Sequence, residues 1–287
     1  ESLEAGVKYL VQSAAGSALI LLGVALVLAE SGTLSLEAIR ITAGSDPLLL
    51  AAGGLLVVGF GVKVALVPMH TWLPDAHAQA PSSISALLSG IVIEAALIAL
   101  LRALIALAGV TATWGVLLLG FGAANMLVGN LMALKQTQVK RLLAYSSVSH
   151  VGVMLLGLGL TLTTGEALGA QGGLFHLITH ALMKGLAFMS VGALMFALGA
   201  HSLTRDDLNG LGRRCPWVAL TLSLALISLG GLPPMAGFMS KWQVFVAGAQ
   251  SGDGWILALV VFAMFNSLLS LAYYMPLINA LYRAQAP

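Results

Sequence analysis

Long runs of apolar residues follow one another along almost the whole chain. We expect eight membrane-crossing helical spans, at about residues 5–29, 46–79 (broken), 82–108, 112–134, 141–162, 168–199, 216–250 (broken) and 254–282. Only 8% of the residues are charged, against about 25% in soluble domains, so the chain cannot cover a water-facing surface. The sequence therefore predicts an all-α, polytopic transmembrane helix bundle, in which 33 glycines favour close helix packing.

The charged residues of the loops divide between two faces. Counting helices places the basic loops on one face, with Lys8, Lys135, Lys140, Arg141, Arg205, Arg213, Arg214 and Arg283. The loops of the other face receive only one basic residue, Arg40, beside Glu30, Glu37, Asp46, Glu166 and Asp253. Because loops rich in lysine and arginine stay in the cytoplasm, the first face is predicted to be cytoplasmic.

Two of the expected spans are too long for one crossing and contain helix breakers. Residues 46–79 contain Pro68 and Pro74, and residues 216–250 contain Gly-Gly-Leu-Pro-Pro at 230–234. Proline removes a backbone donor and clashes with the preceding turn, so each helix should break there. Unpaired backbone in a membrane persists only inside protein or beside a water-filled cavity. Two interrupted helices in matching positions of two halves indicate an ion site in an inverted-repeat transporter.

Seven ionisable residues lie well inside the apolar runs: Lys63, Glu94, His150, His176, His180, Lys184 and Lys241. A charge at the bilayer centre costs about 3 kcal/mol or more, so such residues usually face protein or water and serve a function. Lys63 and Lys241 each lie near a helix break, and we expect both to transfer protons. Snorkelling to a membrane interface is the alternative.

Glu94 is the only carboxylate in the middle of any span. It can carry a proton, or it can be a fixed partner for a lysine. His176, His180 and Lys184 follow one another at intervals of four residues, so they stack along one helix face. Histidine titrates near neutral pH, and such a column can pass protons through short water links. Structural hydrogen bonding and a zinc site are alternatives, although the HxxxH spacing lacks a nearby third ligand.

Other polar residues accompany this set. His150 lies in the segment YSSVSH, where a satisfied polar cluster and a relay role are equally good interpretations. His70, Asp75 and His77 lie in the broken part of the second span, where packing and capping of the break are favoured over a metal site. The single cysteine, Cys215, lies by a charged loop and is interpreted as an incidental thiol.

Motifs for cofactors and nucleic acids are missing from the sequence. The chain has no Walker loop, dinucleotide fingerprint, CxxC or CxxCH sequence. We therefore expect no bound ATP, redox cofactor or metal, and no catalytic redox site in this chain. A soluble binding module is excluded by the composition.

Four segments resemble one family of membrane proteins: VPMHTWLPDAHAQAPSSISALLSG, LMALKQTQVKRLLAYSSVSHVG, GGLFHLITHALMKGLAFMSVGAL and ISLGGLPPMAGFMSKW. Together they are similar to the proton-conducting, antiporter-like subunits shared by respiratory complex I, Mrp-type sodium/proton antiporters and membrane-bound (group 4) hydrogenases. The segments occur in the family's order, and the resemblance covers nearly the whole chain.

The resemblance implies an architecture. Family members have about fourteen helices arranged as two inverted repeats of five, and this chain resembles helices six to thirteen. Residues 1–287 would form one transmembrane proton-conducting domain. Residues 1–110 would be the end of the first repeat and residues 111–284 the second. The family's orientation agrees with the charge distribution, and we expect a multi-pass protein of a prokaryotic inner membrane.

The resemblance also implies roles for the buried residues. Lys63 falls on the family's central proton-binding lysine, and Lys241 falls on the exit-side residue of the second broken helix. The connecting relay falls on His176, His180 and Lys184. Glu94 stands where most members carry a lysine or histidine, a departure from the usual lysine-to-lysine path. The family's fifth helix carries a glutamate that pairs with Lys63, and this chain lacks it, so the chain alone should not pump.

These expectations combine into one functional hypothesis. The chain would be a proton-translocating subunit of a complex I-like, hydrogenase-like or Mrp-type assembly, working with other membrane subunits and moving protons, with sodium as a further candidate ion. Two alternatives stay open. One is an independent secondary transporter for a small solute or ion, and the other is a structural membrane subunit with a non-functional proton path.

Overall fold

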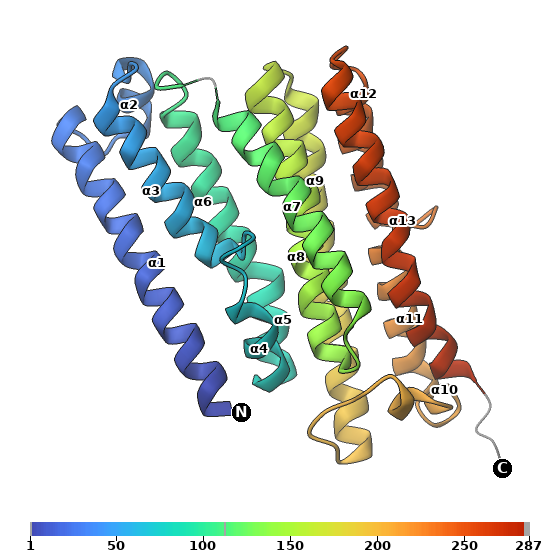
Figure 1. The fold of residues 1–287 in the computed structure, drawn as a ribbon. Helices are drawn as coiled ribbons and strands as arrows, with labels where there is room; N and C mark the ends of the chain where they lie inside the picture. The colour runs from blue at the N-terminus through green and yellow to red at the C-terminus, as the bar shows by residue number, and fades with distance from the viewer. Residues whose placement is uncertain (1, 112, 284–287) are drawn as a thin grey trace.

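The computed structural model describes residues 2–111 and 113–283. Helices make up most of these residues, so the expected all-α fold is confirmed (Figure 1). Seven helices of the described chain are long and apolar enough to cross a membrane: α1 (Ser2–Ser31), α3 (Pro47–Val64), the continuous stretch Ser82–Ala106, α7 (Trp114–Leu134), α8 (Val139–Thr164), α9 (Ala167–Leu198) and α13 (Gly254–Tyr282). The eighth predicted span corresponds to the pair α11 (Pro216–Gly230) and α12 (Ala236–Ala249).

Shorter elements complete the described chain: α2 (Leu36–Thr42), α4 (Trp72–Gln79), η2 (Asp206–Leu208) and α10 (Leu211–Arg214). The continuous stretch is made of α5 (Ser82–Leu87), the π-helical segment η1 (Leu88–Val92) and α6 (Ile93–Ala106). In Figure 1 the long helices form three neighbouring groups, with α1, α3 and α6 at one side, α7 to α9 in the centre and α11 to α13 at the other side.

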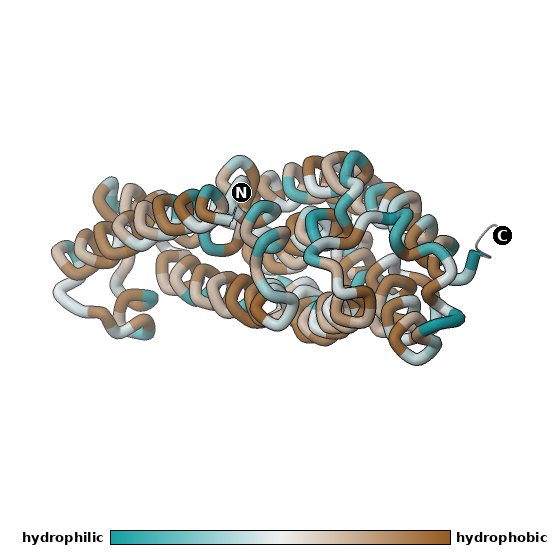
Figure 2. The backbone as a smooth tube through the Cα atoms, turned by 90° about the horizontal axis from the view of Figure 1, so that it is seen from below, coloured by the Kyte–Doolittle hydropathy of each residue, from teal (hydrophilic) through white to brown (hydrophobic). Residues whose placement is uncertain are grey.

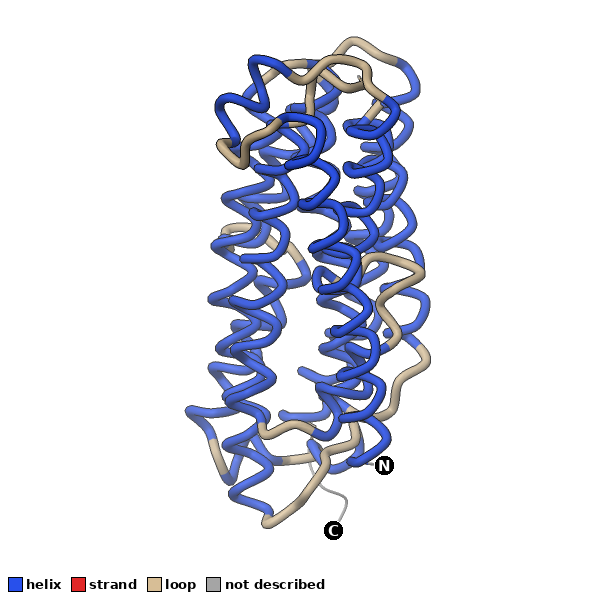
Figure 3. The backbone as a smooth tube through the Cα atoms, turned by 90° about the vertical axis from the view of Figure 1, so that its left-hand side faces the viewer, coloured by secondary structure: helices blue, strands red, loops and turns tan. Residues whose placement is uncertain are grey.

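The loops gather at the two ends of the bundle (Figure 3). Viewed from the end that holds both termini, hydrophilic residues concentrate on the loops and helix ends, and the helix shafts are mainly hydrophobic (Figure 2). At this end Lys8, Arg141 and Thr204 line one cavity of about 600 Å³. Arg40 and Arg102 lie together at a different site. The loops that the charge pattern assigns to one face therefore do meet in space.

Helix α8 is the centre of the bundle. Every residue from Leu142 to Leu160 is buried. Close approach of α7 to α8 depends on glycine: a Cβ atom added at Gly152 would lie 2.6 Å from the Gly122 carbonyl oxygen. Two backbones can approach this closely only where side chains are absent, as is common between membrane helices.

The first helix break begins at Val64, where α3 ends before Pro68 is reached. The backbone groups freed there are held by a buried amide, because Asn125 on α7 accepts a hydrogen bond from the Val67 N–H (2.8 Å) and donates to the Ala65 carbonyl (3.2 Å). Pro74, predicted to break the helix, instead lies in the first turn of α4. A proline is tolerated in a first turn because the backbone N–H is not needed there.

The second break lies between α11 and α12, as the Gly-Gly-Leu-Pro-Pro segment predicts. Gly231 ends α11 with a φ of 78°, which a residue without a Cβ atom adopts readily. The Ser228 hydroxyl accepts a hydrogen bond from the Gly237 N–H (3.2 Å), and the Lys241 ammonium donates to the Leu229 carbonyl (2.9 Å). Both breaks lie at mid-height in the bundle (Figures 1 and 3).

Candidate functional site

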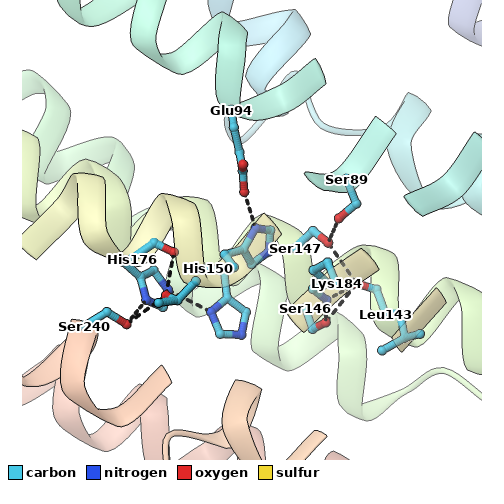
Figure 4. Close-up of polar contacts among 11 residues, drawn as sticks. Ser89, Glu94, Leu143, Ser146, Ser147, His150, His176, Lys184 and Ser240 are labelled. Carbon is cyan, nitrogen blue, oxygen red and sulfur yellow. Dashed lines mark hydrogen bonds and ion pairs between the residues drawn. The ribbon is translucent and has the colours of Figure 1, made fainter. Parts of the chain in front are cut away.

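Glu94 enters the centre of the bundle directly after the π-helical segment η1. This segment passes close to α9, since a Cβ atom at Gly90 would lie 3.1 Å from the Ala181 carbonyl oxygen. A π-turn inserts one extra residue and so rotates the residues that follow it, and such turns are frequent at functional sites. Glu94 is 4% exposed, and its Oε1 atom lies 2.8 Å from Nδ1 of His180 on α9 (Figure 4).

Three imidazole rings continue from this carboxyl group through the bundle. The rings of His180 and His150 are adjacent, with centroids 5.1 Å apart. His150 on α8 is hydrogen-bonded through Nδ1 to Nε2 of His176 (3.0 Å), and Nδ1 of His176 is hydrogen-bonded to the Ser240 hydroxyl (2.8 Å). The result is a buried polar run from Glu94 to Ser240 that joins α6, α9, α8 and α12 (Figure 4).

Two buried lysines flank this run, and their surroundings are alike. Lys184 on α9 donates to the Leu143 carbonyl (2.7 Å) and to the Ser146 hydroxyl. Lys241 on α12 donates to the Leu229 carbonyl and to the Ser267 hydroxyl, both at 2.9 Å. Lys241 directly follows Ser240 on α12, the helix at which the polar run ends.

The contacts of these lysines suit either protonation state. An ammonium group has three donors, whereas a neutral amine has two donors and one lone pair. A carbonyl and a hydroxyl provide two acceptors, and the hydroxyl can turn to donate to the lone pair. Neither Lys184 nor Lys241 has a carboxylate within ion-pair distance among the described residues. The arrangement therefore allows each lysine to gain and lose a proton without losing its hydrogen bonds.

Lys63 lies apart from the polar run. It is half-buried on α3, and its ammonium donates to the Ser13 hydroxyl on α1 (3.1 Å). It lines a small cavity of about 30 Å³ that also includes Val92 of η1. Within residues 2–111 and 113–283 it makes no ion pair. The structure thus brings together five of the six residues predicted to transfer protons and leaves Lys63 at the edge.

Three residues predicted to support the site, Asp75, His70 and His77, lie outside the polar run. Asp75 lies in the polar cavity at the end with the termini, in ion pairs with Lys8 (2.9 Å) and Arg141 (2.8 Å). His70 lies in the loop between α3 and α4, its ring centroid 6.3 Å from that of Tyr145. His77 on α4 is fully buried. In the described part of the chain, no three histidine, cysteine or acidic residues converge to hold a metal.

Sequence reasoning missed several residues that hold the site. Lys140, assigned to a basic loop, is 2% exposed and donates to the Ala80 carbonyl at the end of α4. Ser240 joins the histidines to the second broken helix. Asn125 supports the first break, and Asn130 is bonded to Asn266 on α13. The sequence feature that could have identified them is the pair of asparagines in the otherwise apolar run of α7. Polar side chains inside a membrane are costly, so they usually have a specific partner.

Comparison with known proteins identifies one family and several relatives of this chain. Residues 1–267 match the family described as NADH:quinone oxidoreductase/Mrp antiporter, transmembrane. Hydrogenase-4 component B of Escherichia coli K12 is 37% identical over 255 residues, which are 85% of this chain and 38% of that protein. NADH-quinone oxidoreductase subunit N of Geotalea uraniireducens is 38% identical over 290 residues, which are 98% of this chain and 59% of that protein.

A solved structure agrees with these relatives. A chain of the Mrp complex from Dietzia sp. DQ12-45-1b superposes with a TM-score of 0.89 at 26% identity, covering 99% of this chain and 52% of that one. The chain therefore spans less than two thirds of the length of the proteins it matches, and these proteins are parts of multi-subunit membrane complexes. The resemblance found in the four sequence segments is confirmed. The chain belongs to the NADH:quinone oxidoreductase/Mrp antiporter transmembrane family.

Proposed function

We propose that this chain forms the proton-translocating part of an antiporter-like subunit in a complex I-like, hydrogenase-like or Mrp-type membrane assembly. The observation that carries the proposal is the buried polar run from Glu94 through His180, His150 and His176 to Ser240. Ionisable groups inside a membrane protein are costly and commonly mark ion or proton paths. Imidazole rings accept a proton at one nitrogen and release it from the other, so a hydrogen-bonded pair of rings can pass a proton along.

Each residue has a role in this path. Glu94 takes up and releases a proton at one end, and the three histidines carry it across α8 and α9. Lys241 receives it at the second broken helix, where Ser240 is bonded to His176 and Ser267 is bonded to the Lys241 amine. Lys184 holds a further proton beside the histidines. Lys63 transfers protons at the first broken helix, together with a partner residue that lies outside this polar run.

The orientation and the ion belong to the same proposal. The end of the bundle with the basic loops faces the cytoplasm of a prokaryote, by the positive-inside rule. Residues 1–110 are the end of one inverted repeat and residues 111–284 the other, each with one broken helix.

Protons are favoured over sodium because the path consists mainly of imidazole and amine groups. A sodium ion would need several oxygen ligands, such as the unwound carbonyls found in sodium-coupled transporters.

Replacing Glu94 tests the proposal. The Glu94→Gln variant would be made in the full-length subunit and purified within its native complex, then reconstituted in proteoliposomes. Glutamine keeps the size and can still bond to His180, but it cannot carry a proton. We expect a lower ratio of protons moved to substrate turned over, measured with a pH-sensitive dye beside turnover. Ser223→Ala is the matched control, since this buried hydroxyl on α11 lies outside the path.

The alternatives predict different results. An unchanged proton-to-turnover ratio in Glu94→Gln, together with an unchanged ratio in Lys63→Ala, would mean that the subunit is structural. Uptake of a small solute by the isolated full-length protein, driven by a gradient and without turnover of a complex, would identify an independent secondary transporter.

A further inference from the structure

Both ring nitrogens of His150 are engaged in contacts with other side chains. Nδ1 is hydrogen-bonded to Nε2 of His176, and the hydroxyl of the fully buried Tyr274 on α13 lies 3.4 Å from Nε2. A neutral imidazole has one donor nitrogen and one acceptor nitrogen. Because Nδ1 faces His176, a proton that enters His150 and leaves toward His176 arrives at Nε2, where the Tyr274 hydroxyl lies.

The direction of these hydrogen bonds follows from Ser240. Its hydroxyl donates to the Ala236 carbonyl of its own helix (3.1 Å), a bond that serine commonly makes inside helices. Nδ1 of His176 then donates to the Ser240 oxygen, and Nε2 of His176 accepts from Nδ1 of His150 (Figure 4). Nε2 of His150 is left as an acceptor, and the Tyr274 hydroxyl donates to it. At rest, the donors of this chain therefore all point from α13 toward α12.

Two groups near His150 can supply a proton to this tyrosine. Nε2 of His180 is buried and has no partner among the described residues, and the His180 ring adjoins that of His150. The Ser146 hydroxyl accepts from Lys184 and lies one helical turn before His150 on α8. A water molecule can bridge from either group to the Tyr274 hydroxyl.

We propose that Tyr274 is a proton-transfer residue, whose hydroxyl passes on the proton that enters His150. This inference rests on the proposed function. The Tyr274 hydroxyl proton moves to Nε2 of His150 while the hydroxyl oxygen takes up a proton from its own donor, so no tyrosinate is left. The Nδ1 proton of His150 moves to Nε2 of His176, and the Nδ1 proton of His176 moves to the Ser240 oxygen. Ser240 releases its own proton toward the neutral amine of Lys241, so only Lys241 gains charge.

Replacing Tyr274 with phenylalanine tests the proposal in the full-length subunit within its native complex. Tyr274→Phe keeps the buried ring and removes only the hydroxyl. We expect the ratio of protons moved to substrate turned over to fall as far as it falls in Glu94→Gln. Tyr273→Phe is the matched control, because it removes the neighbouring buried hydroxyl, which donates to Asn130 (2.8 Å), and leaves His150 untouched. It should keep the wild-type ratio.

The outcomes separate this inference from the proposed function. A wild-type ratio in Tyr274→Phe, alongside a loss in Glu94→Gln, would overturn the role of Tyr274 and leave the proposed function standing. Equal losses in Tyr274→Phe and Tyr273→Phe would assign both tyrosines to packing. Unchanged ratios in both Tyr274→Phe and Glu94→Gln would overturn the inference and the proposed function together.

Two further readouts are ones that packing would not move. In nitrogen NMR of the full-length subunit with labelled histidines, the His150 signals are those lost in His150→Asn. We expect a protonated Nδ1 and a hydrogen-bonded, unprotonated Nε2, whose resonance shifts in Tyr274→Phe and not in Tyr273→Phe. A wild-type Nε2 that carries the proton would overturn the direction of the chain.

A ring-fluorinated tyrosine at position 274 separates proton transfer from positioning of His150. It keeps the hydroxyl and makes it more acidic. The rate of a proton transfer depends on the acidity of the donor, so the translocation rate should change with each added fluorine. An unchanged rate across the fluorinated series would contradict proton transfer and leave Tyr274 only a positioning role.

Discussion

Asn125 bonds to two backbone groups that the first helix break leaves free, and Asn125→Leu tests how much this stabilises the break. Leucine has the same number of side-chain heavy atoms and the same branching, but no polar atoms. The replacement removes the partners of the Val67 N–H and the Ala65 carbonyl, and among the described residues neither group has another. The Val148 carbonyl also accepts a hydrogen bond from Asn125 (3.2 Å), but it lies inside α8 and keeps its hydrogen bond within that helix.

The cost of Asn125→Leu follows from these two backbone groups. A buried donor or acceptor left without a partner costs about 1–3 kcal/mol, so two of them cost about 2–6 kcal/mol. Side-chain hydrogen bonds in membrane proteins average only about 0.6 kcal/mol, which points to the lower half of that range. We therefore expect a loss of about 3 kcal/mol. For a domain of 150–250 residues this would lower the melting temperature by about 6–12 °C, and for this longer protein we expect a shift near or below the lower end of that range.

The assay is a thermal melt of the purified full-length protein in detergent, followed by intrinsic tryptophan fluorescence. Thr221→Val is the matched control. It removes a hydroxyl contact to Ser190 (3.1 Å) but leaves no backbone group without a partner. A melting temperature of Asn125→Leu as high as that of the control would refute the argument that this amide stabilises the break.

Two further results are expected from helix packing and from a surface loop. Gly152→Leu should prevent folding or accumulation of the protein in the membrane, because its Cβ atom would lie 2.6 Å from the Gly122 carbonyl oxygen, whereas Gly120→Leu on the open side of α7 should accumulate normally. Hydrogen bonds from the Thr204 hydroxyl and N–H lower the pKa of Asp207, so the stability they provide is present above the ordinary value of 3.8 and is lost as the pH falls through the lowered value. Faster hydrogen exchange of this loop in Asp207→Asn at neutral pH, with the difference disappearing in acid, would bear this out, and an equal difference at both pH values would contradict it.

The helix count and the loop grouping could be predicted from the sequence because both depend on local patterns. Runs of about 20 apolar residues and the charges between them are visible without knowing which helix packs against which. The break after Gly230 was predictable for the same reason, since glycine and proline act on their own backbone. The limits of the first break were not, because Pro74 fits a new helix start as well as it fits an end.

The contacts within the site could be predicted only in part. The spacing of His176, His180 and Lys184 places them on one helix face, but it does not reveal that His180 meets Glu94 while His176 meets His150. Those pairings depend on the packing of α6, α8 and α9 and on a π-turn that no propensity predicts. Lys140 was assigned to the loop by its neighbours Lys135 and Arg141, yet the packing of α8 against the end of α4 buries it.

The described interior holds too many ionisable groups for all of them to be charged at once. Two like charges 4 Å apart repel by about 4 kcal/mol at an effective dielectric constant of 20, and Lys184 and Lys241 both act on the ring of His150. Glu94 is the only carboxylate of the polar run, so it balances one positive charge and no more. On the proposed path, a proton that arrives at one amine or imidazole would therefore favour release from another. In this proposal, the Glu94 carboxylate neutralises one protonated amine or imidazole at a time, whereas a basic residue at position 94 would add a further repulsion.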